Sequence, residues 1–496
     1  MSKRKHNVGV IGAGIGGLAT AILLAKKGYD VHLYEKNNYL GGKVTSFESN
    51  GFRFDTGASL LTMPDVLKDF FSSLELKIHD FLEIKNLEII TKYFYSDSSQ
   101  IIAYQDFNKF SEEIENKTLD TKESLRRYFS YSEQIYNLTA ELFIFDEFKN
   151  INKIFTRKGL KTLFSILKID PFRTIHKANS TFFKDPKTIQ LFDRYATYNG
   201  SNPFQAPATL NIIPFVEYKL GGYFLQGGMI DLTKALSKLV ELFDVKVHLN
   251  TNVDKIVSTG TRVSGIIVNG EFREHNIVVS NSDVNYTFKN LLAGFESKEA
   301  RRNIENKPSS SALVYYWGME GNYPELEAHN ILFSEDYKKE FDEIFIEKKV
   351  PSDPTVYIYI SSKFNKNDAP NNSENWFVMI NTPENNGQNW AQAISSTKEV
   401  ILEKIEKTLR KNVKNHIVSE NILTPLDLEK KTNSFKGSIY GISSNTRNAA
   451  FLRQTNKSQS LQNLFFVGGS VHPGGGIPLV ISSAKIVSKL ISNNYD

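Results

Sequence analysis

This chain of 496 residues contains no cysteine. A disulfide, a thiol nucleophile and a zinc–thiolate site are therefore excluded, and redox chemistry requires a bound cofactor. The absence fits a reducing compartment. The net charge is only +5 and no nucleic-acid-binding motif is present, so we expect no nucleic-acid partner and no metal site. After residue 25, no uncharged run is long enough to cross a bilayer.

Aromatic residues, by contrast, are plentiful, with 35 phenylalanines and 22 tyrosines. Charged residues make up 23% of the chain and apolar residues 40%, which is typical of a globular protein. The length allows two or three domains. Such a chain has enough aromatic residues to line a large apolar cavity, although hydrophobic cores use the same residues.

The one long uncharged run, residues 8–25, follows the basic start MSKRKHN, as in a signal peptide. Its glycines argue against that interpretation, because each interior glycine costs a helix about 1 kcal/mol relative to alanine. Gly12, Gly14 and Gly17 form a G-x-G-x-x-G pattern between a predicted strand and a predicted helix that starts at Leu18. A second predicted strand ends at Glu35, 18 residues after Gly17.

This arrangement predicts a dinucleotide-binding strand–helix–strand unit. Gly12 would make the tight turn, Gly14 would let a phosphate approach the backbone, and Gly17 would let the helix pack close to the strand. Glu35 would accept a hydrogen bond from a ribose hydroxyl. The positive end of the helix dipole would face the pyrophosphate.

The segment after Glu35, NNYLGGKVTSFESNGFRFDTGASLLTMP, contains a glycine pair followed by Lys43 and then a D-x-G pattern that starts at Asp55. It resembles the flavoprotein family of amine oxidases and carotenoid desaturases, which carry G-G-R and then D-x-G. Lys43 replaces the arginine, which keeps the charge but loses the planar fork. The resemblance implies FAD as cofactor. It also implies that this segment runs beside the pyrophosphate and the flavin ring, through Lys36, Gly42, Lys43, Gly57, Ala58 and Ser59.

Near the end of the chain, NLFFVGGSVHPGGGIPLVISSAK predicts a strand, a glycine-rich turn and a helix that starts near Leu479. It resembles the C-terminal motif of bacterial-type phytoene desaturases, which have a small hydroxyl residue at the position of Ser470 where amine oxidases have aspartate. The helix start would then face the N1–C2=O edge of the flavin. The residues implied to contact the cofactor are Gly469, Ser470, Ile477 and Pro478. His472 is more simply explained as structural.

Residues 245–283 contain four strand-like runs and a hairpin signal at Asn269–Gly270. In the family, the chain returns to the cofactor domain here, with the backbone near Val253 at the adenine. The predicted fold class is therefore α/β, a Rossmann-type FAD-binding domain with a discontinuous α+β substrate domain. The FAD-binding domain comprises residues 1–70, 225–290 and 455–496. The substrate-binding and membrane-associating domain comprises residues 71–224 and 291–454.

The resemblance implies an FAD-dependent desaturase that forms a C=C bond in an acyclic C40 carotenoid by hydride transfer to the flavin. Residues 194–211, 374–381 and 440–453 look most like hydroxyneurosporene (1'-hydroxy carotenoid 3,4-) desaturases. Phytoene desaturase, a retinol saturase- or carotene isomerase-like enzyme, and a non-catalytic lipid-binding relative remain alternatives. The catalytic residues stay unassigned: Asp55, Glu217 and the reduced flavin itself are all candidates for the base. The electron acceptor, quinone or oxygen, also stays open.

Residues 195–229 and 353–383 are expected to line the substrate tunnel. The tunnel is expected to be apolar along its length, because a hydroxyl at the far end of the substrate requires no polar groups deep inside. Hydroxylated and unhydroxylated carotenoids would then react at rates within about tenfold. Seven aromatic residues are candidates for the walls, at least half of which are expected to be ordinary core residues: Tyr195, Tyr198, Phe204, Phe215, Tyr218, Tyr223 and Phe224.

One stretch, residues 149–177, carries eight lysines and arginines against one aspartate, interleaved with apolar residues. A basic amphipathic stretch of this kind predicts contact with an anionic membrane surface. The alternative is a solvated helix that packs its apolar face on the core. With the membrane interpretation, the protein is expected to be cytoplasmic and peripherally bound to a membrane.

Overall fold

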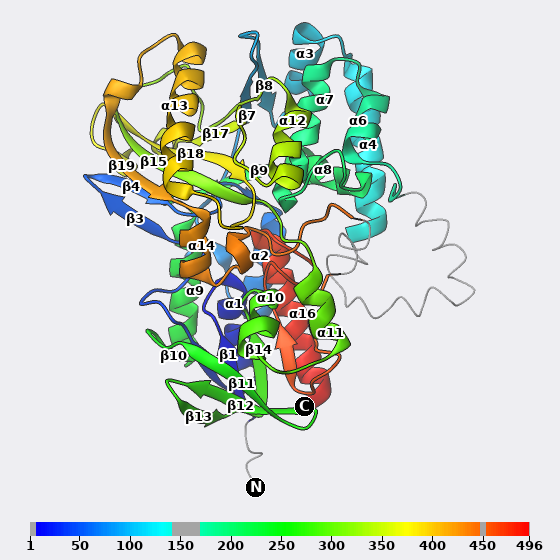
Figure 1. Cartoon of the computed structure of the whole chain (residues 1–496), viewed down its shortest axis with the longest axis vertical. Helices are drawn as coiled ribbons and strands as arrows, with labels where there is room; N and C mark the ends of the chain where they lie inside the picture. The colour runs from blue at the N-terminus through cyan, green and yellow to red at the C-terminus, as the bar shows by residue number, and fades with distance from the viewer. Residues whose placement is uncertain (1–5, 141–168, 447–452, 496) are drawn as a thin grey trace.

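Two sheets dominate the computed structural model, which describes residues 6–140, 169–446 and 453–495 (Figure 1). The lower sheet is parallel, has five strands and runs in the order β10-β2-β1-β14-β20. Segments far apart in the sequence supply its strands, so this sheet is discontinuous along the chain. The strands are β1 (Asn7–Ile11), β2 (Asp30–Tyr34), β10 (Lys246–His248), β14 (Ile277–Ser280) and β20 (Leu464–Phe466).

The predicted strand–helix–strand unit is present at the centre of this sheet. Helix α1 (Ile15–Lys26) starts three residues earlier than predicted, because Gly16 and Gly17 lie in its first turn. A Cβ atom on Gly17 would lie only 2.0 Å from the carbonyl oxygen of Gly12, so the close packing overrides the low helix propensity of glycine. Helices α9 (Ile230–Leu242) and α16 (Ile477–Tyr495) pack against α1.

A small antiparallel sheet, formed by β11 (Val253–Thr259), β12 (Arg262–Val268) and β13 (Glu271–Glu274), follows β10. Asn269 and Gly270 form the predicted hairpin turn with φ angles of 51° and 79°. Residues 245–283 therefore contain five strands rather than the predicted four. The exposed β13 has little apolar alternation, so its pattern was hard to recognise.

The upper sheet has seven strands in the order β19-β15-β18-β17-β16-β7-β8. All its pairs are antiparallel except β16 with β7. Its strands are β7 (Ile89–Phe94), β8 (Gln100–Tyr104), β15 (Ser311–Glu320), β16 (His329–Leu332), β17 (Val356–Tyr359), β18 (Ser373–Thr382) and β19 (Ile417–Leu423). One face buries Leu313, Trp317 and Ile358 in a cluster with Ile401 and Ile405 of α13 (Trp390–Leu409).

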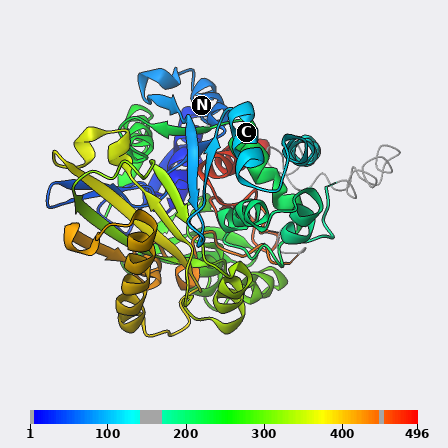
Figure 2. The ribbon, with the colours of Figure 1, turned by 90° about the horizontal axis from the view of Figure 1, so that it is seen from above.

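The helices of the upper half gather mainly to one side of this sheet (Figure 2). They are α3 (Phe107–Lys117), α4 (Lys122–Thr139), α6 (Ile175–Phe182), α7 (Pro186–Asp193) and α8 (Ile212–Lys219). The remaining elements named here are mostly shorter. They are α2 (Pro64–Ser73), α10 (Val284–Tyr286), α11 (Lys298–Glu305), α12 (Tyr337–Asp342), α14 (Pro425–Thr432), the hairpin β3 (Ser46–Ser49) and β4 (Phe52–Asp55), and the sheet β5 (Leu61–Thr62), β9 (Gly222–Leu225) and β6 (Ile84–Asn86).

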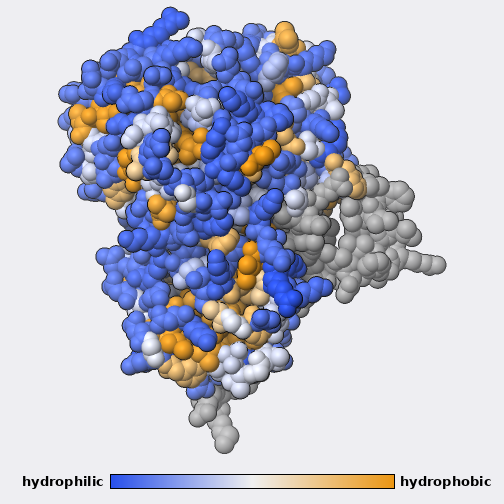
Figure 3. Space-filling view, viewed as in Figure 1, coloured by the Kyte–Doolittle hydropathy of each residue, from blue (hydrophilic) through white to orange (hydrophobic). Residues whose placement is uncertain are grey.

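Every strand of the lower sheet falls within the residues assigned from sequence to the FAD-binding domain, while the boundaries themselves stay a prediction. The face shown in Figure 3 is mostly hydrophilic, with small apolar patches. None of the helices in the described residues is both long and apolar enough to cross a membrane. Residues 149–168 of the basic stretch lie outside the described residues. In the remainder, Arg173 pairs with Asp170 at 2.6 Å.

Candidate functional site

A large cavity of about 1190 Å³ connects the lower sheet with the upper one. Its walls combine the carboxyl ends of the parallel strands, the starts of α1 and α16, and one face of the seven-stranded sheet. Ligand pockets usually measure about 300–1,000 Å³, so this cavity can hold a dinucleotide together with part of a second molecule. Fourteen of the fifteen residues that were predicted to bind the cofactor line it, and Gly17 lies behind the wall.

Glu35 is fixed at the cavity wall by backbone hydrogen bonds. It follows β2 directly, its side chain is buried, and its Oε2 accepts from the Ala13 N–H at 2.8 Å. Oε1 accepts from the Asn37 N–H at 2.9 Å. A carboxylate oriented in this way can accept a further hydrogen bond from a ribose hydroxyl, so its position fits a bound dinucleotide.

Asn281 lines the cavity beside the glycine turn, and sequence reasoning did not identify it. It follows β14, and its Nδ2 donates to the Val467 carbonyl at 3.0 Å. A Cβ atom on Gly14 would lie 2.9 Å from the Asn281 Oδ1. The bare backbone at Gly14 therefore forms a narrow cradle at the cavity wall. Strand order was the missing information, because β14 lies beside β1 only in the folded sheet.

Two lysines of the predicted cofactor segment connect it to residues 430–439. The Lys43 Nζ donates to the Ile439 carbonyl at 2.7 Å, and burial lowers the pKa of Lys43 to about 8. Asp283 attracts this ammonium group electrostatically, while burial raises the pKa of Asp283. The Lys36 Nζ donates to the Lys430 carbonyl at 2.6 Å. Both lysines line the cavity and give this part of it positive charge.

The C-terminal motif also faces the cavity. Helix α16 starts at Ile477, two residues before the predicted start, with Pro478 in its first turn. The Ser470 Oγ accepts from the Val284 N–H at 3.0 Å. Arg453, which sequence reasoning missed, donates to the carbonyl groups of Tyr440, Ile442 and Gly469. Burial lowers its pKa to about 10.

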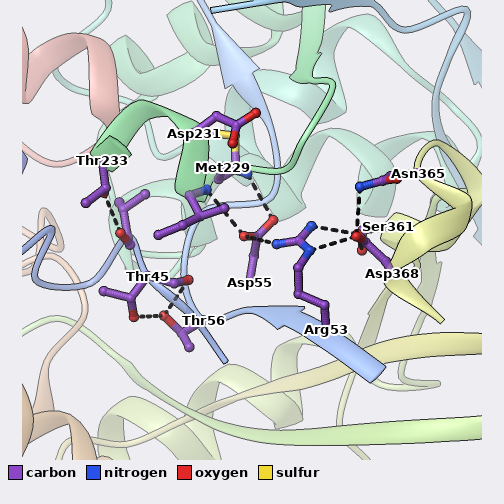
Figure 4. A network of polar contacts seen from close by, with 12 residues as sticks. Thr45, Arg53, Asp55, Thr56, Met229, Asp231, Thr233, Ser361, Asn365 and Asp368 are labelled. Atoms are coloured by element: carbon purple, nitrogen blue, oxygen red, sulfur yellow. Dashed lines mark hydrogen bonds and ion pairs between the residues drawn. The ribbon is translucent and has the colours of Figure 1, made fainter. Parts of the chain in front are cut away.

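Asp55, one candidate for the base, is occupied by structural contacts (Figure 4). Its Oδ1 pairs with the Arg53 Nη1 at 3.0 Å, and its Oδ2 accepts from the Met229 N–H at 2.9 Å next to the start of α9. The Arg53 guanidinium also binds Asp368 through two hydrogen bonds of 2.7 and 2.6 Å. This network joins β4, α9 and the loop before β18, which is a structural role.

Glu217, the other candidate, lies in a second buried network. It accepts from the Tyr195 hydroxyl at 2.6 Å, from the Arg194 Nη2 at 3.2 Å and from the Tyr198 hydroxyl. Its side chain is fully buried, and the neighbouring tyrosines and Glu217 raise the pKa of Arg194. Both oxygens are engaged, and Glu217 is not among the lining residues of the cavity, so it does not face a substrate carbon in this arrangement.

Both segments predicted to line the tunnel contribute to the cavity wall, but most of the aromatic candidates do not. The contributing residues include Leu210, Ile213, Val216, Tyr357, Phe377 and Met379. Of the seven aromatic candidates, only Tyr198 is among the described lining residues, while Tyr218 stacks on Phe110 at 4.8 Å in the core. Side chains alternate along a strand, and the sheet face opposite α13 forms the wall. Its apolar lining comprises Ile331, Ala312, Val314, Tyr316, Phe377 and Met379.

The expectation that the tunnel is apolar along its length is wrong. Arg194 and His329 line it and are 6% and 3% exposed. Tyr357 and Asn381 also line it, from β17 and β18. Sequence alone does not show which face of each strand meets the cavity.

Known proteins match this chain over almost its whole length. The family model for flavin-containing amine oxidoreductases matches residues 15–492. A 1-hydroxycarotenoid 3,4-desaturase from Flavobacterium sp. (strain P99-3) is 42% identical over 98% of both chains. A 4,4'-diapolycopene oxygenase from Methylomonas sp. is 32% identical, again over 98% of both chains.

Solved structures share the fold at low sequence identity. An oxidoreductase from Methanosarcina mazei matches with a TM-score of 0.64 and 14% identity, over 97% of this chain and all of the other. A wild-type putrescine oxidase bound to putrescine matches with a TM-score of 0.63 and 12% identity, over 99% of both chains. These matches confirm the α/β fold class predicted from sequence.

Proposed function

The chain belongs to the flavin-containing amine oxidoreductase family and is an FAD-dependent oxidoreductase, and we propose that it introduces a C=C bond into a hydroxylated acyclic carotenoid. The main support is the cavity, which runs without interruption from the glycine turn to an apolar face of the upper sheet. The similarity to the Flavobacterium desaturase over almost the whole chain supports the same substrate class.

In this proposal, the chain binds, orients and shields the reactants. FAD, when bound, supplies a hydride acceptor. Glu35 and the backbone at Gly14 would hold the dinucleotide, as their positions allow. The apolar sheet face would hold the polyene so that one allylic C–H bond lies within about 3–3.5 Å of the acceptor atom. The buried walls would also exclude water from the reacting carbons.

A carotenoid panel tests the proposal. Purified holoenzyme is incubated with liposomes that contain a single acyclic carotenoid and a quinone, under air. We expect a red shift of the carotenoid absorption with hydroxylated acyclic substrates, because each new double bond extends the conjugation. Phytoene should react much more slowly, since its short triene places the allylic positions near the middle of the rod. Rapid stepwise conversion of phytoene to lycopene would instead support a phytoene desaturase.

A lipid-soluble substrate also supports peripheral membrane binding through the basic stretch of residues 149–177. Each basic residue near an anionic surface contributes about 1 kcal/mol. Replacing Lys153, Arg157, Lys158 and Lys161 by glutamine should reduce pelleting with phosphatidylserine-containing liposomes at low salt. As a control, the same four-residue change at exposed lysines elsewhere should have less effect. Pelleting that neither the substitutions nor added salt reduce would contradict this proposal.

A further inference from the structure

A buried histidine on the cavity side of the upper sheet has one ring nitrogen without a partner. His329 is the first residue of β16, and it lines the cavity together with Ile331, two residues later. The next residue, Leu332, belongs to the cluster on the opposite face. The side chain of His329 is almost fully buried, yet its Nε2 has no hydrogen-bond partner among the described residues.

Contacts on the other side of the ring fix its orientation. The Nδ1 of His329 lies 2.8 Å from the Tyr357 hydroxyl, and that hydroxyl lies 2.6 Å from the Ser59 Oγ. The imidazole also stacks on Tyr359, with a centroid distance of 4.8 Å. Ser59 follows Gly57 and Ala58 in the segment predicted to run beside the flavin. His329 is thus held rigidly in the part of the cavity where that segment meets the upper sheet.

The electrostatic surroundings keep this ring neutral. Burial, together with the positive charge of Arg194, lowers the pKa of His329 to about 3. A neutral imidazole has one N–H donor and one acceptor nitrogen. When Tyr357 donates to Nδ1, Nε2 carries the hydrogen and donates. When Nδ1 donates to Tyr357, Nε2 accepts. A hydroxyl group can serve as partner in both cases, because it both donates and accepts.

We propose that Nε2 of His329 forms a hydrogen bond with the hydroxyl group of the substrate and thereby selects hydroxylated over unhydroxylated carotenoids. This inference rests on the proposed function. The name of the Flavobacterium relative places the hydroxyl on C1 and the new double bond at C3–C4. In a substrate of that kind the carbon that carries the hydroxyl lies only two bonds from C3, the nearer reacting carbon, so the hydroxyl enters the cavity with the reacting carbons and does not remain at the mouth.

A buried polar atom without a partner is unfavourable, and a ligand that supplies the partner is preferred over one that does not. A hydrogen bond of this type corresponds to a preference of about 10- to 100-fold. This exceeds the discrimination expected from sequence alone, because sequence did not show a polar group inside the cavity.

An internal competition measures the preference directly. Holoenzyme receives liposomes that contain equal amounts of a 1-hydroxylated acyclic carotenoid and its unhydroxylated parent, and the two desaturated products are separated and quantified. The product ratio depends only on the ratio of the two kcat/KM values. A variant that folds or binds flavin incompletely therefore still gives a valid ratio. We expect wild-type enzyme to favour the hydroxylated substrate by at least about tenfold.

Four variants test the role of the ring nitrogen. His329→Leu should bring the ratio close to one, whereas His329→Gln, whose amide can replace Nε2, should retain part of the preference. Tyr357→Phe removes the group that orients the ring and should weaken the preference. Tyr316→Phe removes a hydroxyl from the same cavity wall, bonded to the Thr56 carbonyl, and should leave the ratio unchanged.

The outcomes separate this inference from the proposed function. If both substrates react but wild-type enzyme prefers the hydroxylated one by less than tenfold, or if His329→Leu leaves the ratio unchanged, the assignment of His329 is wrong while the desaturase function stands. If neither carotenoid reacts, the proposed function is wrong, and the assignment of His329 fails with it.

Discussion

Gly14→Val is expected to purify without flavin. Gly14 lines the cavity at the turn before α1, where the helix N-terminus would face the pyrophosphate. A Cβ atom there already lies 2.9 Å from the Asn281 Oδ1, and Asn281 is tied to the Val467 carbonyl. The two methyl groups of valine must therefore displace the Asn281 amide or project into the cavity, and either change disturbs the turn where the phosphates are expected. Flavin content is measured as the flavin absorbance relative to the protein absorbance.

Two controls separate lost binding from lost folding. Gly14→Ala adds one methyl group, which a small shift of the Asn281 amide accommodates, so this variant should keep part of its flavin. Ala391→Val also introduces a valine, but at an exposed position of α13 outside the cavity. This variant should keep all of its flavin. Full flavin occupancy in a folded Gly14→Val protein would show that this turn is not the phosphate site.

Arg53→Met is expected to lower the free energy of unfolding by about 3–5 kcal/mol. The side chains of Asp55 and Asp368 are only 2% and 1% exposed, and both pair with Arg53. Without the guanidinium, two buried carboxylates lose their counter-charge. The network also joins β4 to α9 and to the loop before β18 (Figure 4), so its loss weakens the connection between the two halves. Urea unfolding followed by circular dichroism measures the change.

The destabilisation by Arg53→Met should be larger at pH 8 than at pH 5. Burial raises the pKa of Asp55 in the native protein, although Arg53 opposes this shift. A carboxyl group with a raised pKa binds its proton more tightly in the folded state. It therefore favours folding at acidic pH, and this contribution is lost as the pH rises through its folded-state pKa. Removing Arg53 raises the pKa of Asp55 further, because Arg53 no longer opposes the effect of burial. The pH range in which ionisation of Asp55 opposes folding therefore becomes wider.

An exposed ion pair provides the matched control. Arg273 pairs with Glu271 on β13, where the two side chains are 57% and 71% exposed. Arg273→Met should change the free energy of unfolding by at most about 1 kcal/mol, because exposed pairs contribute little. An Arg53→Met effect as small as this control, or one that decreases between pH 5 and pH 8, would contradict the structural role assigned to the network.

Local sequence was sufficient to predict the cofactor part of the fold. The turn at Gly12, the helix that follows it and the acidic residue at the end of β2 are determined by interactions within about thirty residues. Glycine patterns are informative because few other residues permit such close backbone approach. The resemblance to the flavoprotein family, on both terminal motifs, identified the cofactor and the enzyme class that the comparisons support.

Tertiary structure alone decided which side chains meet inside the cavity. Asp55 and Glu217 were both candidates for the base, yet each is held by partners that only the folded chain brings to it. The Met229 N–H binds Asp55, and Arg194 and the Tyr195 hydroxyl bind Glu217. His329 and Tyr357 meet because β16 pairs with β17, 28 residues apart in the sequence. Periodicity shows that a strand has two faces, but which face borders a cavity depends on what packs against the other, here α13.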